Sequence, residues 1–312
     1  MSRKVRLSHF HSQFQKNLRW RKGMNFVFAG LALCILFLSL SLLLTLIVDL
    51  AMTGLPRISL DFFTQFPSRI PSRAGILAAW VGTFLVMLVT ALISIPIGVG
   101  AGIYLEFYAK KNKLSKFIEI NILNLAAIPS ITFGLMALGL FVYRFKLGQS
   151  ILTAGMTLGL LVLPLIIVST REALRTVPQT IHEACYALGA TKWQMIHGHL
   201  LPYSLGGILT GVIIALSRAI GETAPLVTVG ALTFIAFLPT SPWTDEAPFV
   251  SMKWLMDPYT VMPIQMFDWV SRPQAEFHVN AAATGLVLLC MTLLLNGVAI
   301  YIRYRFRKKV SW

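Results

Sequence analysis

Residues 75–105 read GILAAWVGTFLVMLVTALISIPIGVGAGIYL and hold no charged side chain over 31 positions. A membrane-crossing helix needs roughly 20 mainly apolar residues, so this run is long enough for one tilted crossing that continues beyond the bilayer. Further apolar runs lie at residues 26–48, 124–143, 149–170, 203–238 and 280–302. The sequence therefore predicts an all-α, polytopic membrane protein with six transmembrane helices.

The composition argues against the classes of protein that a basic chain usually suggests. Of 312 residues, 56% are hydrophobic and 12% are charged, with a formal net charge of +15, whereas an average soluble domain is about a quarter charged. An ordinary soluble enzyme is therefore disfavoured. Binding to nucleic acid needs basic side chains on a solvated domain, but here they gather in short segments between apolar runs. We expect no nucleic-acid partner.

The basic residues predict the orientation of the chain in the membrane. Nineteen of the 27 Lys and Arg lie in the two terminal tails and in the loops after the second and fourth apolar runs. Because basic loops stay in the cytoplasm, both termini are expected there, in a cell inner (plasma) membrane, and the number of crossings is even. The expected segments are a basic tail at 1–25, the first span with its external loop at 26–74, a core of five helices at 75–302 and a basic tail at 303–312.

The cytoplasmic loop at residues 171–202 is predicted to form two short helices. Pro178 suits the start of the first, and Gly189 can end it in a left-handed conformation. Thr191 and Gln194 then have the spacing of a capping box, which starts the second.

Apolar residues of the first short helix recur at helical spacing, at Ile181, at Ala184 or Cys185, and at Leu188. Pro202 is interpreted as the first turn of the next span. The loop then either rests as an amphipathic linker on lipid headgroups or docks on a cytoplasmic partner through its small residues.

One pattern in this loop is the triplet Glu183-Ala184-Cys185 followed, at fixed intervals, by Gly189 and the pair Leu201-Pro202. It resembles the EAA loop of ABC-transporter importer permeases, although Cys185 replaces the second Ala and His199 replaces an Ile. The resemblance implies that the loop is a coupling helix that docks on a separate ATPase subunit. The residues that carry this role are Glu183, Ala184, Gly189, Leu201 and Pro202.

The fifth apolar run contains two charges, Arg218 and Glu222, four residues apart. On a helix this spacing puts both on one face, where they can pair. A charged side chain inside a bilayer costs at least a few kcal/mol, so it faces protein or an aqueous cavity rather than lipid.

Two interpretations of this pair remain open. It is either a structural ion pair or part of a transport pathway, and the second is favoured because an Arg in a cavity suits bidentate binding of an oxyanion. In that case Ser217 and Thr223 add neutral hydrogen-bond donors. Pro225 limits the helix, and a break here would expose backbone groups to the pathway.

The stretch 217–225, which reads SRAIGETAP, resembles the signature of the phosphate-specific ABC permeases, in particular their PstA subunit. Residues 102–109, 124–135 and 257–265 show the same resemblance, which covers about residues 75–305. It implies that the two charged residues of the fifth run serve the path of phosphate.

The resemblance also implies the partners of the chain. They are a homologous second permease subunit, two cytoplasmic ATPase subunits and an extracytoplasmic phosphate-binding protein. Some members carry an Arg and a Glu at the end of the fourth span. Here Arg171 and Glu172 are shifted to the cytoplasmic boundary, where an anchor at the interface is at least as good an interpretation.

The sequence lacks the motifs of the main alternatives. It has no G-x-x-x-x-G-K-[ST] and hence no P-loop, so we expect no enzyme activity and ATP hydrolysis by a partner. The histidines and three scattered cysteines show no metal-site spacing, and no cofactor is expected. The alternatives left are an ABC permease for sulfate, molybdate or phosphonate, and a secondary transporter that needs no ATPase.

Overall fold

The computed structural model describes the backbone of residues 3–110, 112–241 and 251–309, and the side chains of residues 20–305 within those ranges. In these ranges the chain is helical and contains no β-strand, which confirms the all-α prediction. It divides into two compact units, residues 1–53 and 54–312. Each unit is described by itself.

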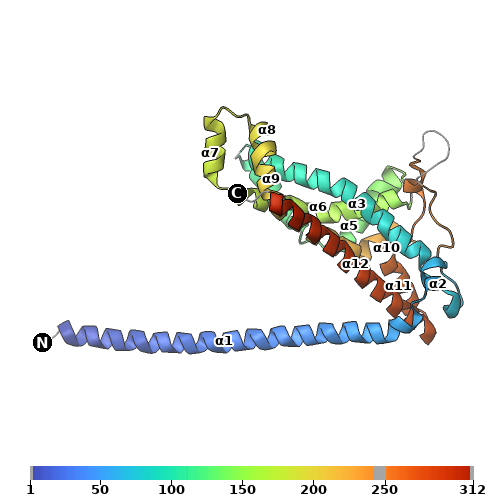
Figure 1. Cartoon of the computed structure of the whole chain (residues 1–312), viewed down its shortest axis with the longest axis horizontal. Coiled ribbons are helices and arrows are strands. Elements are labelled where there is room, and N and C mark those ends of the chain that lie inside the picture. The colour runs from blue at the N-terminus through green and yellow to red at the C-terminus, as the bar shows by residue number, and fades with distance from the viewer. Residues whose placement is uncertain (1–2, 111, 242–250, 310–312) are drawn as a thin grey trace. The chain divides into compact units, whose positions relative to one another are not determined.

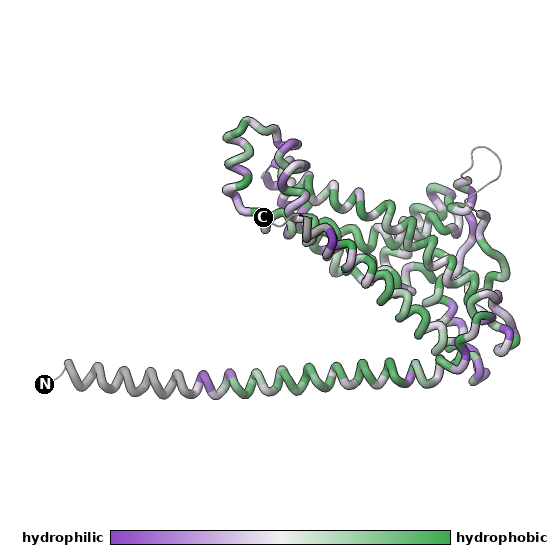
Figure 2. Tube along the Cα trace, viewed as in Figure 1, coloured by the Kyte–Doolittle hydropathy of each residue, from purple (hydrophilic) through white to green (hydrophobic). Residues whose placement is uncertain are grey.

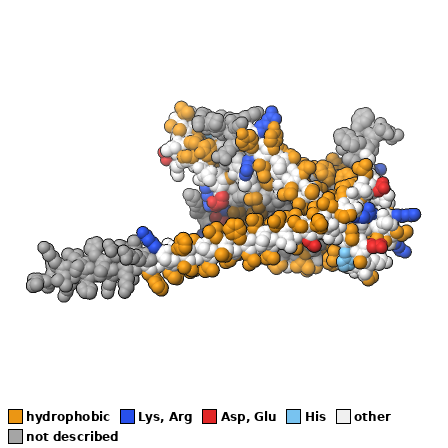
Figure 3. Space-filling model, turned by 60° about the horizontal axis from the view of Figure 1, so that its bottom comes forward, with side chains coloured by type: hydrophobic (Ala, Val, Ile, Leu, Met, Phe, Trp, Pro, Cys, Tyr) orange, Lys and Arg blue, Asp and Glu red, His pale blue; other side chains and the backbone are white. Residues whose placement is uncertain are grey.

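Helix α1 (Arg3–Gly54) continues without a break from the basic tail through the first apolar run. Side chains such as Phe26, Leu36 and Leu46 are exposed along it. Figure 2 shows the hydropathy of this stretch along the trace, and Figure 3 shows hydrophobic side chains on its surface. A helix that is apolar all round is typical of a membrane span that lipid or other helices surround. The first predicted span is therefore a single helix.

Four long helices form the frame of the second unit: α3 (Leu77–Ile103), α6 (Ile151–Arg175), α9 (Leu201–Ile220) and α12 (Ala275–Lys309). α3 packs on α6, α6 on α9 and α9 on α12, and all four run alongside one another in Figure 1. Within the described ranges, α1 and these four helices, the third extended by α8, are long and apolar enough to cross a membrane. A bent helix pair supplies the sixth span if it is counted as one.

Small residues let these helices approach closely. A Cβ atom added to Gly98 of α3 would lie 2.6 Å from Ile166 Cγ2 of α6, and one added to Gly211 of α9 would lie 2.0 Å from Ser169 Oγ of α6. Without a hydrophobic driving force in lipid, membrane helices associate through such close packing. Gly102 and Gly207, each four residues from one of these glycines, also lie against α6, at Thr170 and Ala173, so both Gly-x-x-x-Gly pairs serve helix contact.

The third span differs from the prediction. Instead of one helix at residues 124–143, the structure has α4 (Lys113–Leu125) and α5 (Ser130–Ala137), the latter continued by a π-helical segment, η4 (Leu138–Arg144). The two parts meet at 107°. Pro129 has an extended ψ of 136° at the start of α5, and a residue before proline avoids the helical region. Hydropathy does not register this break.

The fifth span is also broken, as Pro225 suggested. α9 ends at Ile220, residues 221–223 are not helical, and α10 (Ala224–Val229) follows. α10 ends at Val229, and Gly230 after it has a φ of +96°, a conformation that favours glycine. The helical part of the predicted run 203–238 is therefore much shorter than the run itself.

Pro202 lies in the first turn of α9, as predicted, but α9 continues a helix that begins further back in the chain. A continuous helix runs from Lys192 to Ile220, made of α8 (Lys192–Met195), a π-helical turn, η5 (Ile196–Leu200), and α9. Proline cannot donate the usual helical hydrogen bond, and a π-turn accommodates an interrupted pattern inside a helix. Pro202 lies directly after that turn and so is tolerated within the helix.

The short elements that connect the long helices gather at the end of the second unit that lies away from α7 and α8 (Figure 1). Arg57 Nε donates to Asn280 Oδ1 of α12 at 2.8 Å, and the Met262 amide donates to Thr83 Oγ1 of α3 at 2.9 Å. Burial raises the pKa of the Tyr259 phenol, so this side chain stays neutral in the interior. The short elements are η1 (Leu55–Arg57), α2 (Leu60–Thr64), η2 (Pro71–Arg73), η6 (Lys253–Met256) and α11 (Met262–Val270).

The two broken spans pack against each other at Gly134 of α5. A Cβ atom there would lie 2.7 Å from Pro225 Cα of α10. We expect Gly134→Ala to separate α5 from α10 and to lower stability by roughly 1–3 kcal/mol, the usual cost of overpacking. Thermal unfolding of the purified protein in detergent measures the change.

Gly139 is the matched control, because a Cβ atom added to it meets no atom within 4 Å. Gly139→Ala should leave the melting temperature unchanged. Equal melting temperatures for the two variants would show that the close approach at Gly134 does not matter.

Candidate functional site

Arg218 lies in the last turn of α9, and Glu222 lies in the break before α10. Their side chains pair through Arg218 Nε and Glu222 Oε1 at 3.3 Å, with 51% of the Arg218 side chain exposed and 18% of the Glu222 side chain. The predicted pair is therefore present, although the helix ends before Glu222. The Glu222 carboxylate is largely covered while half of the Arg218 side chain is accessible, so the pairing leaves part of the guanidinium open to a ligand.

The remaining nitrogens of Arg218 are available to a ligand. Within the described part of the chain, the side chain forms a hydrogen bond through Nε and none through its two terminal nitrogens. Arg218 also lines a small pocket together with Leu125, Ala126 and Ile128, which lie at the bend between α4 and α5. A guanidinium held at Nε with both terminal amino groups free can bind an oxyanion bidentately.

Unlike Glu222, Ser217 and Thr223 form no hydrogen bond with the Arg218 side chain among the described residues. Ser217 Oγ contacts Ile213 O at 2.6 Å and also Asn296 Oδ1 of α12, so it faces the α9–α12 contact. Thr223 is half-buried at the start of α10 and its side chain does not cap that helix. The structure brings Arg218 together with Glu222, whereas Ser217 points to a neighbouring helix.

The cytoplasmic loop has the predicted form. α7 (Gln179–Ala187) begins directly after Pro178, and Gly189 has a φ of +78°. The capping box of Thr191 and Gln194 is present in full. In Figure 1, α7 and α8 lie at one end of the long helices, opposite α2 and α11.

α7 has one buried and one exposed face. Cys185 is buried against Leu174, and Ile181 packs beside it, but Leu188 is 89% exposed. Leu188 has the helical spacing of this face but lies just beyond α7, which ends at Ala187. Glu183, Ala184 and Gly189 are exposed as well.

The exposed residues of the loop form a surface that a partner can reach, which we call the loop surface and define as Glu183, Ala184, Tyr186, Leu188 and Gly189. The two other residues of the EAA pattern, Leu201 and Pro202, are half-buried in the first turn of α9. They join the loop to the fifth span and do not belong to that surface.

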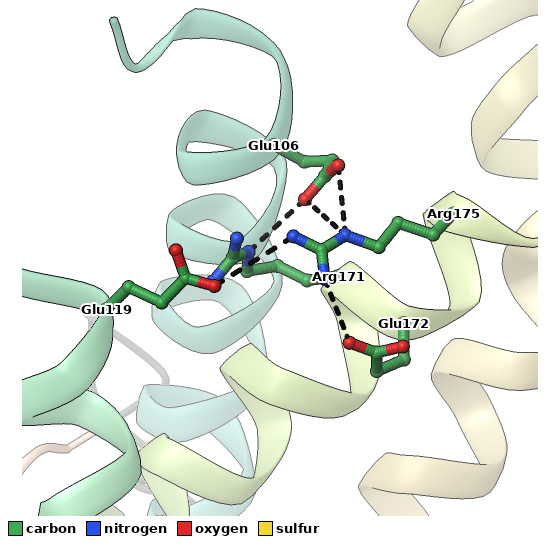
Figure 4. Close-up of polar contacts among 5 residues, drawn as sticks. All are labelled: Glu106, Glu119, Arg171, Glu172 and Arg175. Atoms are coloured by element: carbon green, nitrogen blue, oxygen red, sulfur yellow. Dashed lines mark hydrogen bonds and ion pairs between the residues drawn. The ribbon is translucent and has the colours of Figure 1, made fainter. Parts of the chain in front are cut away.

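A cluster of ion pairs lies where α6 meets this loop (Figure 4). Arg171, only 9% exposed, pairs with Glu106 Oε2 at 3.3 Å and with Glu119 Oε1 at 3.0 Å. Arg175 pairs with the same Glu106 oxygen at 3.0 Å and with Glu172 at 3.1 Å. Glu106 lies in the π-helical segment η3 (Tyr104–Tyr108) and Glu119 in α4. The cluster therefore ties three segments together.

Sequence reasoning missed most of this cluster. It singled out Arg171 and Glu172 as an interfacial anchor but not Glu106, Glu119 or Arg175. The one available signal was two acids in an otherwise basic stretch, 104–123. Among the described residues, no group of three His, Cys, Asp or Glu could hold a metal ion.

The comparison with known families decides the class of the protein. The family described as "Binding-protein-dependent transport system inner membrane component" matches residues 94–312, which include the whole ion cluster, the loop surface and Arg218. The chain belongs to this family.

Individual relatives of this inner membrane component agree with the assignment. The phosphate transport system permease protein PstA of Yersinia pestis is 32% identical over 301 residues, covering 95% of this chain and 94% of the relative. The probable ABC transporter permease protein YqgI of Bacillus subtilis (strain 168) is 29% identical over 276 residues, covering 87% and 92%. A solved inward-facing structure of the MetNI methionine ABC transporter shares the fold, with a TM-score of 0.53 and 19% identity over 72% of this chain and 91% of that chain.

The ion cluster of this inner membrane component should contribute to its stability. We expect Glu106→Gln to lower stability by roughly 1–3 kcal/mol, because it leaves two partly buried guanidinium groups short of one carboxylate; a fully buried pair would cost about 3–5 kcal/mol. Thermal unfolding in detergent measures the effect. Glu172→Gln is the control, since the Glu172 side chain is 64% exposed and pairs with Arg175 alone. A larger loss in the control would contradict the role of Glu106.

Gly189 tests the shape of the loop surface. A side chain there has open space around it, so only the φ of +78° opposes substitution. We expect Gly189→Val to distort the turn after α7 and to weaken docking of the ATPase, because β-branched residues are strongly disfavoured at positive φ. Co-purification of the ATPase with the tagged permease measures docking. Gly198→Val is the control, because Gly198 also has open space but lies in a helical turn. Undiminished docking and ATP hydrolysis with Gly189→Val would refute the coupling role.

Proposed function

We propose that this chain is a permease subunit of an ATP-driven ABC importer that moves inorganic phosphate across the cytoplasmic membrane. The observation that carries the proposal is Arg218, which stands at a break in a membrane helix with its two terminal nitrogens free within the described residues. A planar guanidinium matches two oxygens of one phosphate group. The similarity to PstA of Yersinia pestis supports phosphate as the transported ion.

In this proposal each residue near Arg218 has a definite part. Glu222 accepts the Nε hydrogen of Arg218 and so orients the guanidinium toward the bend between α4 and α5. Thr223, in the same break, offers a hydroxyl to the path. Ser217 does not contact the ion but stabilises the site indirectly, because its hydroxyl joins α9 to Asn296 of α12. Phosphate passes this site without a chemical change, so the chain itself is not an enzyme.

The loop surface is the proposed contact with a cytoplasmic ATPase. Glu183, Ala184 and Gly189 present the docking face, while Leu201 and Pro202 transmit its movement into α9. The continuous helix from Lys192 to Ile220 supports this, because one end lies in the loop and the other carries Arg218. A push on the loop is thus passed along a single rigid helix to the site.

The complete importer then contains this chain, a homologous second permease subunit, two ATPase subunits and an extracytoplasmic phosphate-binding protein. We place it in the cell inner (plasma) membrane with both termini in the cytoplasm, because most Lys and Arg flank that side. The permease core at 75–302 forms the path and the tails at 1–25 and 303–312 face the cytoplasm.

Substitution of Arg218 tests the pathway. We expect Arg218→Gln to lower uptake of radiolabelled phosphate roughly 10- to 100-fold, because a hydrogen bond to a charged group contributes about 1.5–3 kcal/mol. Membrane insertion and assembly with the ATPase should be unchanged. Arg69→Gln, an exposed position outside the long helices, is the control and should transport normally. Normal uptake by Arg218→Gln would overturn the assignment.

Two further measurements separate the alternatives. Excess unlabelled sulfate, molybdate or phosphonate should leave labelled phosphate uptake unaffected; strong competition by one of them would reassign the transported oxyanion. Inactivation of the ATPase should abolish uptake. Uptake that survives it would point to a secondary transporter.

A further inference from the structure

A second cavity lies at the other end of α4, beside the ion cluster. Its volume is about 750 Å³, within the range of about 300–1,000 Å³ that is typical of small-molecule sites. It shares no lining residue with the pocket at Arg218. It is formed by Leu105, Glu106, Ala109, Lys110, Asn112, Lys113, Ser115, Lys116, Glu119, Arg171 and Arg175.

The lining carries an excess of positive charge that the protein leaves uncompensated. The two carboxylates, Glu106 and Glu119, already pair with Arg171 and Arg175 at 3.0–3.9 Å. The remaining cations are Lys110, Lys113 and Lys116, and within the described residues none of the three has an acidic partner. Three ammonium groups therefore surround one cavity with no carboxylate left to neutralise them.

The neutral polar groups of the cavity are donors too. Asn112 uses its side-chain oxygen to accept the Ser115 amide hydrogen at 2.9 Å. Within the described residues its amide nitrogen and the Ser115 hydroxyl form no hydrogen bond, and both residues line the cavity, so both groups can donate to a ligand. An arrangement of ammonium, amide and hydroxyl donors around a small space fits an anion with several oxygens, and lysine binds phosphate as a point charge.

The ion cluster gives this cavity a rigid wall. Arg171 is nearly buried and connects Glu106 of η3 with Glu119 of α4 (Figure 4). The lysines extend from the first turns of α4 and from the segment before it. The spacing between the wall and the lysines is therefore held by ion pairs rather than by a mobile loop.

The surface next to the cavity is apolar. Leu114 and Phe117 are exposed on α4, each directly after one of the lysines in sequence. Lysines that alternate with exposed apolar residues on one helix are typical of a segment at a membrane surface that carries anionic lipid. A phosphate group can thus reach the cavity from a lipid headgroup or from free phosphate in the cytoplasm.

We propose that this cavity binds a phosphate group at the cytoplasmic end of α4, through Lys110, Lys113 and Lys116 with Asn112 and Ser115. The shared chemistry is a tetrahedral phosphate with one or two negative charges. The site is separate from Arg218 and does not require that Arg218 transport phosphate.

The test uses the assembled importer and two probes. The variant replaces Lys110, Lys113 and Lys116 by Gln. The control carries Arg144→Gln, Lys146→Gln and Lys253→Gln, which remove the same charge from exposed positions elsewhere. The first probe is phosphatidylglycerol, counted as lipid retained per complex by native mass spectrometry, with phosphatidylcholine as the uncharged comparison. The second is radiolabelled inorganic phosphate, measured by equilibrium binding to complexes that carry Arg218→Gln.

We expect the lysine variant to lose at least about tenfold in affinity for one of the two probes while the control keeps it, because each basic group near an anionic surface contributes about 1 kcal/mol, or a factor of about five. Loss of the lipid alone identifies a headgroup site, and loss of inorganic phosphate identifies a site for the free ion. Equal loss in lysine variant and control, or unchanged binding of both probes, overturns the proposal.

Because the phosphate-binding measurement uses complexes that carry Arg218→Gln, it reports on the cavity and not on the proposed transport site. A failure of the transport assignment appears as normal uptake by Arg218→Gln, whereas a failure of the cavity appears as unchanged binding in the lysine variant. The three lysine side chains are exposed and unpaired within the described residues, so their replacement should leave the melting temperature unchanged. Measuring that temperature checks that the lysine variant is folded.

Discussion

Broken backbone inside a membrane must be covered by protein or must line a cavity, because lipid offers no hydrogen-bond partner. The described part of the chain has two such breaks, at the bend between α4 and α5 and between α9 and α10. They meet each other: Gly134 of α5 touches Pro225 of α10, and Arg218 lines a pocket with the α4–α5 bend. The candidate site exists because each break is covered by the other.

The cytoplasmic end depends on a different interaction. Arg171 and Arg175 hold η3 and α4 to the end of α6 through Glu106 and Glu119. α6 leads directly into α7, and the helix that follows the loop carries Arg218 at its far end. The loop surface and the break are thus connected by rigid helices, which is the mechanical requirement for a permease driven by a separate ATPase.

Several local features were correctly predicted because they depend on a few neighbouring residues. The start of α7 after Pro178, the left-handed Gly189 and the capping box at Thr191 all follow from local stereochemistry. The bend at Pro129 and the continuation of the fifth span back to Lys192 were not predicted. Hydropathy counts apolar residues over a long run, so it does not register where backbone hydrogen bonding changes. Leu188 has helical spacing with Ile181 although α7 has already ended at Ala187, because a residue pattern does not show where a helix stops.

The sequence by itself determined the membrane class and the helical fold, since uncharged runs of this length have no other stable state. It also predicted the Arg218–Glu222 pair, because a separation of four residues brings side chains together at a helix end. Only the tertiary structure decided that Arg218 faces the α4–α5 bend, that Ser217 faces α12, and that Glu106 and Glu119 meet the two arginines of α6. These contacts join residues up to about 90 positions apart, and they depend on how whole helices cross, which no short window of sequence encodes.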